Sequence, residues 1–254
     1  MHKLFYELLQ VAIGQLDCVE RGPSPEEWHE LHDMAVRHDL TAVAYRGVEK
    51  LFEFGLRAPQ DLSIDWMAEA EERPNDYPEP QLPLCQQTAI DDYAGKRKQA
   101  ARNPLANWQL QRWFAKQTEK TAAATAGDTQ DGPEPAMTAF VMLLELQQGF
   151  LYSRINLRQL MDLFLVMRKN KGKFAPLPDG MTLEQALRKF GLWRFTQGVM
   201  WVMLQIFAMD KKLALGNPQE ATGQFILQEV MSDKRHPWQF WRHYPWAMLN
   251  SWLG

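Results

Sequence analysis

His29 and His32 are spaced so that both side chains could face one metal ion from the same side of a helix. A catalytic zinc site usually takes three protein ligands, and no third candidate stands nearby in the sequence. The pair is more typical of a solvated helix face. We therefore predict no metal site here.

A short basic run could bind a phosphate group through its positive charge. It consists of Lys96, Arg97, Lys98 and Arg102. Such a run more often forms a solvated turn or helix face. Because the whole chain has a formal net charge of -3, its composition does not favour nucleic acid, and we expect no nucleic-acid partner.

The C-terminal stretch holds many aromatic side chains beside His and Arg residues. Its large aromatic residues are Trp238, Phe240, Trp241, Tyr244, Trp246 and Trp252. Aromatic rings beside cations suit a membrane interface or the stacking of bases. The commoner arrangement, which we predict, is a tail that packs on the protein's own core.

Length and composition are those of a soluble globular protein that can bury a sizeable core. The chain has 254 residues, of which 46% are hydrophobic and 23% are charged. Cys18 and Cys85 stand far apart, so we expect no disulfide framework or structural zinc site, and a cytoplasmic setting. The most apolar window, 192–209, contains Arg194 and Gln197. It therefore predicts a buried helix and no transmembrane segment.

The clearest predicted helix covers residues 155–169. Its apolar residues recur at the spacing of one helical face: Leu157, Leu160, Met161, Phe164 and Met167. Asn156 and Gln159 can form a capping box at its start. Arg158 and Asp162 lie one turn apart and can pair along the helix, so we interpret both as structural supports and not as catalysts.

Helical periodicity and capping signals predict further helices along most of the chain. Ser24, Pro25 and Glu27 form the clearest start signal, with an N-cap, a proline at the first helical position and a capping box. The other predicted helices are one marked by Leu4 to Ala12, then 41–54, 63–72, 103–117, 137–152, 182–190 and 192–209. A last one has the cap, proline and acid start signal of Asn217, Pro218 and Glu220, before Phe225 to Leu227 and Val230.

The composition changes in the middle of the chain, which suggests four parts. Residues 73–117 contain several prolines and one strand-like fragment at 88–93, and residues 118–135 are poor in bulky apolar side chains. We therefore expect an N-terminal helical region at 1–72, a reduced core segment at 73–117, a flexible linker at 118–135 and a C-terminal helical domain at 136–254.

Several segments together resemble a family of uncharacterised nucleotidyltransferase-like proteins of gut Bacteroidetes. They are LLQVAIG (8–14), PSPEEWHEL (23–31), GVEKL (47–51), NPLANWQLQRWF (103–114), INLRQLMDLFLV (155–166), GLWRFTQGVMWV (191–202) and HYPWAML (243–249). The resemblance implies a mainly α protein, in which a multi-helix envelope surrounds a reduced, vestigial α/β core of the MNT or aminoglycoside nucleotidyltransferase type.

The chemistry implied by this resemblance is the Mg²⁺-dependent transfer of a nucleoside monophosphate from an NTP to a hydroxyl acceptor. It needs a Gly-containing loop, an Asp-x-Asp on a strand and a third carboxylate. A strand alternates its faces, so only an intervening residue lets two Asp side chains point at the same metal ions. The corresponding pieces here are the stretch 77–82 and the pair Asp91 and Asp92.

This chain departs from that pattern at several positions. Asp91 and Asp92 are adjacent, no glycine occurs in 71–76, and Glu145 and Gly149 stand where the resemblance implies histidines. The stretch between the Asp pair and residue 103 is also too short for the remaining strands.

We therefore expect a catalytically degenerate protein whose helical envelope serves as an interaction or regulatory module for a protein partner. One alternative is an active Mg²⁺-dependent nucleotidyltransferase that binds an NTP, with Asp91 or Asp92 as the metal ligand. A second alternative is an internally deleted product without an independent function.

Overall fold

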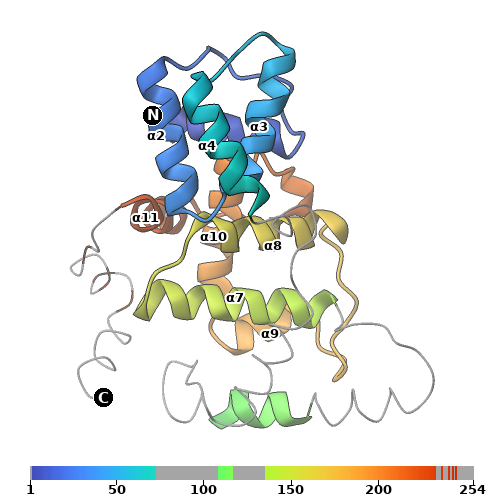
Figure 1. Ribbon diagram of the computed structural model, residues 1–254. Helices are drawn as coiled ribbons and strands as arrows, with labels where there is room; N and C mark the ends of the chain where they lie inside the picture. The colour runs from blue at the N-terminus through green and yellow to red at the C-terminus, as the bar shows by residue number, and fades with distance from the viewer. Residues whose placement is uncertain are drawn as a thin grey trace. The chain divides into compact units, whose positions relative to one another are not determined.

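A computed structural model describes residues 2–72, 108–116 and 135–232, together with residues 236, 240, 242 and 244. Every regular element in this part of the chain is a helix (Figure 1). The predicted mainly α class is confirmed. The strand-like fragment at 88–93 and most of the expected α/β core segment lie outside the described residues.

The described residues form two compact units. The first contains residues 2–72 with 156–165 and 202–211. The second contains 108–116, 135–155, 166–201 and 212–232, with the four isolated residues near the C-terminus. The N-terminal helices thus share a unit with two short pieces from the C-terminal half of the chain.

The first unit is built around α3 (Thr41–Glu53). This helix contacts α1 (His2–Ala12), α2 (Pro25–Arg37) and α4 (Gln60–Glu71) (Figure 1). Its buried side includes Val43, Ala44, Gly47, Val48 and Leu51. Because these residues recur at helical spacing, one stripe of α3 serves as the common packing surface of the N-terminal helices.

Local signals fix the start of α2 and the end of α1. The Ser24 side chain accepts a hydrogen bond from the Glu27 N–H, and the Glu27 side chain accepts one from the Ser24 N–H, so the predicted capping box is confirmed. Lys50 Nζ donates to the carbonyls of Val11 and Ala12 at 2.9 and 3.1 Å. A cation there satisfies exposed carbonyls at the negative end of the α1 dipole.

Trp66 anchors α4 in the interior of the first unit. Its side chain is fully buried, and Nε1 donates to the Thr41 carbonyl at 3.1 Å. Leu62, one turn earlier, is buried on the same side. The remaining faces of α4 are mostly exposed. Only one narrow stripe of this helix therefore contributes to the core.

The second unit takes most of its residues from the C-terminal half of the chain. Its elements are a helical stretch at 108–116, α7 (Pro135–Tyr152), the end of α8 (Leu157–Lys169), α9 (Leu183–Lys189), the first part of α10 (Trp193–Ile206), the 3₁₀ turn η2 (Lys211–Leu213) and α11 (Glu220–Met231). The helix predicted at 103–117 is thus present in its described part. The capping box predicted for α9, between Thr182 and Gln185, is confirmed.

Aromatic side chains fill the interior of the second unit. One cluster joins Trp113, Phe114, Phe140 and Phe190. A second joins Phe150, Phe195, Phe225, Phe240 and Tyr244. Phe240 and Tyr244 are buried, so the prediction that the aromatic tail packs on its own core is confirmed for these two residues. The four tryptophans of the tail lie outside the described residues.

The predicted start of the last long helix was wrong. Asn217 and Pro218 resemble a cap followed by a first helical residue, but α11 begins at Glu220, with Gln219 as an N-cap without a side-chain hydrogen bond. Gln197 of α10 explains the difference. Its side chain donates to the Asn217 carbonyl at 2.9 Å, and its own carbonyl accepts from the Gln219 N–H at 3.0 Å. The stretch is thus held extended against α10.

A bilayer crossing needs about 20 consecutive apolar residues. None of the helices in the described ranges combines that length with sufficient apolarity.

Candidate functional site

The predicted catalytic carboxylates, Asp91 and Asp92, lie outside the described residues. The same holds for the basic run of residues 96–102. The assignment of these residues to metal or phosphate binding therefore stays a prediction.

Arg158 and Asp162 are described, and they form the pair that the sequence predicts. Arg158 Nε donates to Asp162 Oδ1 at 3.1 Å, and the Arg158 residue is 8% exposed. At the start of the same helix, α8, the Asn156 and Gln159 side chains each accept a hydrogen bond from the other residue's backbone N–H, both at 3.1 Å. These contacts fit a structural role at the beginning of α8.

His29 and His32 have different environments on α2. His29 is exposed. The His32 ring packs edge-on against Trp66, with ring centroids 5.0 Å apart, and Nε2 lies 3.3 Å from Glu69 Oε2. Among the described residues, no group of three His, Cys, Asp or Glu side chains is placed to hold a metal ion.

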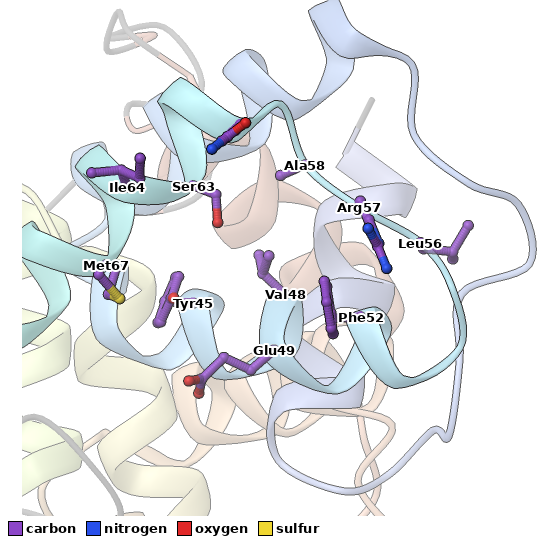
Figure 2. Close-up of a pocket in the computed structure, with 11 residues that line it drawn as sticks. Tyr45, Val48, Glu49, Phe52, Leu56, Arg57, Ala58, Ser63, Ile64 and Met67 are labelled. Atoms are coloured by element: carbon purple, nitrogen blue, oxygen red, sulfur yellow. The ribbon is translucent and has the colours of Figure 1, made fainter.

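The first unit contains a groove between α3 and α4, with a volume of about 680 Å³ (Figure 2). Helix α3 forms one wall, α4 forms the other, and the connection between them closes one end. We call it the α3–α4 groove. Its lining residues are Tyr45, Val48, Glu49, Phe52, Leu56, Arg57, Ala58, Gln60, Ser63, Ile64 and Met67.

Helical periodicity explains why these side chains meet. On α3 the lining residues are 45, 48, 49 and 52, and on α4 they are 60, 63, 64 and 67. Both sets have the i, i+3, i+4, i+7 spacing of one helical face. Each helix therefore presents two faces, one to the core of the unit and one to the groove.

Large apolar side chains of the groove remain exposed to solvent. Phe52 is 56% exposed, Ile64 54% and Met67 40%. Exposed apolar residues are ordinary when they are scattered, but a set that lines one hollow makes this hollow a candidate binding surface. Phe54, directly after α3, has a similar exposure of 55% and is not a lining residue, so it offers a nearby comparison outside the groove.

Polar groups lie at both ends of the groove. At one end, burial raises the pKa of the Tyr45 hydroxyl, the negative charges of Glu49 and Glu71 raise it further, and a hydrogen bond with Ser63 opposes these effects. At the other end, the Arg57 guanidinium carbon lies 4.6 Å from the centre of the Phe52 ring. Figure 2 shows Arg57 beside Phe52 and Tyr45 near Met67.

The groove is large enough to hold a ligand group and is lined by apolar, polar and charged side chains. Its volume lies within the range of about 300–1,000 Å³ that is typical of ligand sites. A hollow in the second unit, lined by Phe150, Arg154 and Glu229 among others, measures about 10 Å³, which is at most the space for one water molecule. The groove is therefore the stronger candidate site in the described part of the chain.

Sequence reasoning did not identify this groove. One signal was available: Ile64 and Met67 lie on a different face of the α4 helix from the core residues Leu62 and Trp66. A second apolar face on a short, acidic helix indicates a second contact surface.

Comparisons with known proteins give no family assignment. No protein-family model matches this chain, no curated protein matches it, and no solved structure matches it.

Proposed function

We propose that this protein is a non-catalytic interaction module, which binds a helical segment of a protein partner in the α3–α4 groove. The observation that carries the proposal is the exposure of Phe52, Ile64 and Met67 within one groove. A packed helical unit that leaves three large apolar side chains in a hollow gains free energy when another apolar surface covers them.

We further propose that the chain descends from a nucleotidyltransferase-like protein whose α/β core is reduced and whose catalytic activity is lost. This rests on the family-like segments and on the adjacent Asp91 and Asp92 in the sequence. At Gly149, where the resemblance implies a histidine, an added Cβ would lie 2.7 Å from Ile155 Cγ2, so a histidine would fit only if Ile155 moved.

The loss of activity is tested with Mg²⁺ and each of the four radiolabelled NTPs. We expect no label on protein or on added hydroxyl acceptors above the level given by an Asp91→Ala, Asp92→Ala double variant. Label transfer that the double variant abolishes would establish the alternative of an active enzyme, in which these carboxylates hold the Mg²⁺ ions.

Binding in the groove is tested first with a dye, anilinonaphthalene sulfonate, whose fluorescence rises on apolar surfaces. We expect Phe52→Ser to reduce the signal, because it removes an exposed ring from the groove. The matched control is Phe54→Ser, which removes an equally exposed ring outside the groove. Equal decreases in dye fluorescence for the two variants would contradict binding in the groove.

The alternative of an internally deleted product predicts poor cooperativity on heating. The packed interiors of the two described units favour the opposite, since both bury large apolar side chains completely. We expect a sharp unfolding transition by circular dichroism. A broad, gradual loss of signal would support the deleted product.

A further inference from the structure

We propose that the natural occupant of the α3–α4 groove is a cationic amphipathic helix, with an apolar face bordered by Lys or Arg residues. This inference rests on the proposed function and specifies the chemistry of the partner. It follows from the shape of the groove and from the charges around it.

The shape of the groove suits about two turns of helix. From Tyr45 to Phe52 the α3 wall spans eight residues, and the seven rises of about 1.5 Å between them give a length of about 10 Å. The α4 wall from Gln60 to Met67 has the same length. Side-chain ridges at i, i+3, i+4 and i+7 on two neighbouring helices accept the ridges of a third helix. In the described residues of this unit no sheet edge is present to which an extended segment could add.

Acidic side chains border the groove on both walls. On α3, Glu49 and the residue one turn later, Glu53, are exposed. On α4, Glu71 is exposed, and its negative charge, like that of Glu49, raises the pKa of the groove residue Tyr45. Helix α4 contains neither Lys nor Arg. The end of the groove at Tyr45 is therefore negative.

Three basic residues lie on α3 or on the connection to α4. Arg46 is exposed on α3, next to Tyr45 in the sequence, and is not a lining residue of the groove. Arg57 is the basic residue among the described lining residues, and its guanidinium lies over the Phe52 ring at one end. Lys50 of α3 donates instead to the end of α1. Positive charge in a bound helix would thus face Glu49 and Glu71 near the Tyr45 end of the groove, away from Arg57.

The acidity extends over the whole N-terminal region. Residues 1–72 contain 15 Asp and Glu against six Lys and Arg, a net charge of -9, whereas the rest of the chain contains 16 against 22. A field of this sign accelerates the association of a cationic partner and disfavours an acidic one. The groove therefore selects its partner by charge as well as by shape.

The test uses full-length protein and three fluorescein-labelled peptides of about 18 residues, or five helical turns. The first is an amphipathic helix of Leu and Lys. The second keeps the Leu positions and replaces every Lys by Glu. The third is a scrambled Leu/Lys peptide, which keeps the charge and lacks the apolar face. Binding is measured by fluorescence anisotropy at low and at physiological salt.

We expect the amphipathic Leu/Lys peptide to bind at least about tenfold more tightly than the other two. The Glu49→Gln, Glu71→Gln double variant should weaken its binding about fivefold, since two partly screened charge contacts are lost. The matched control is Glu30→Gln with Asp33→Asn, which removes two exposed charges from α2 outside the groove lining. It should change the affinity by less than about twofold.

Each of the other outcomes would contradict one part of the proposal. Equal binding of the scrambled peptide would overturn the helical partner, and equal or tighter binding of the Leu/Glu peptide would overturn the cationic one. If the Leu/Glu peptide binds and Phe52→Ser weakens it, the groove still functions as an interaction site and only the charge inference fails. If no peptide responds to Phe52→Ser, the proposed function fails as well.

Discussion

Replacement of Gly47 by alanine tests how closely α1 and α3 pack. An ideal Cβ at position 47 would lie 2.7 Å from the Leu8 backbone oxygen and 2.8 Å from Leu8 Cδ1. The side-chain atom can rotate away. The carbonyl oxygen belongs to the hydrogen-bonded backbone of α1, so relief requires the two helices to separate.

Two opposing effects set the size of the change. Alanine favours a helix over glycine by about 1 kcal/mol. Overpacking a close contact costs about 1–3 kcal/mol, and the rigid carbonyl places Gly47 near the upper end of that range. We therefore expect Gly47→Ala to lower the free energy of unfolding by about 1–2 kcal/mol, which corresponds to a decrease in Tm of roughly 2–8 °C for a chain of this size.

The assay is urea unfolding followed by circular dichroism. Ala68→Gly is the control for helix propensity, because Ala68 is an exposed residue within α4. It should cost about 1 kcal/mol through propensity alone. If Gly47→Ala were as stable as the wild type or more stable, the close approach of α3 to the α1 backbone would be refuted.

Three further changes test other parts of the structure. Gly223→Ala should lower the free energy of unfolding by about 1–3 kcal/mol, because the added Cβ would lie 2.5 Å from Trp201 Cε3. Unchanged urea unfolding would contradict this close contact between α10 and α11. Ser24→Ala should cost about 1 kcal/mol in the same assay, since it removes the cap of the Glu27 N–H; no loss would mean that the cap contributes nothing to stability. Burial raises the pKa of Tyr244 from about 10 to about 12, and the nearby positive charge of Arg194 opposes this effect. The buried, protonated Tyr244 hydroxyl therefore contributes its full stability below pH 10, and this contribution is lost as the pH rises toward 12. The free energy of unfolding of wild type should therefore fall more steeply above pH 10 than that of Tyr244→Phe, by up to about 1.4 kcal/mol per pH unit, and parallel curves at pH 9–11 would argue against a buried hydroxyl.

Local signals predicted the helices and several of their ends. The capping boxes at Ser24, Asn156 and Thr182 all form, because each joins residues three positions apart and needs no tertiary partner. The core stripe of α3 was equally readable, since burial at helical spacing leaves a direct trace in the sequence.

The features that the sequence did not predict depend on tertiary contacts. The start of α11 depends on Gln197, about 20 residues earlier in the chain, so the proline after Asn217 gave a misleading signal. The fourth helix was expected from residue 63 and begins at Gln60, which contributes the first residue of the α4 wall to the groove. The groove itself exists only because α3 and α4 pack at their core-facing stripes and leave their adjacent faces open.

The most direct test of the central proposal compares the affinity of the amphipathic Leu/Lys peptide for two variants, Phe52→Ser and Phe54→Ser. About 100 Å² of each ring is exposed, from 56% and 55% of roughly 200 Å². At about 25 cal/mol per Å², full burial in the groove would contribute at most about 2.5 kcal/mol. We expect Phe52→Ser to bind about tenfold more weakly than Phe54→Ser, which corresponds to partial burial of the ring. Equal dissociation constants would contradict the groove as the binding site.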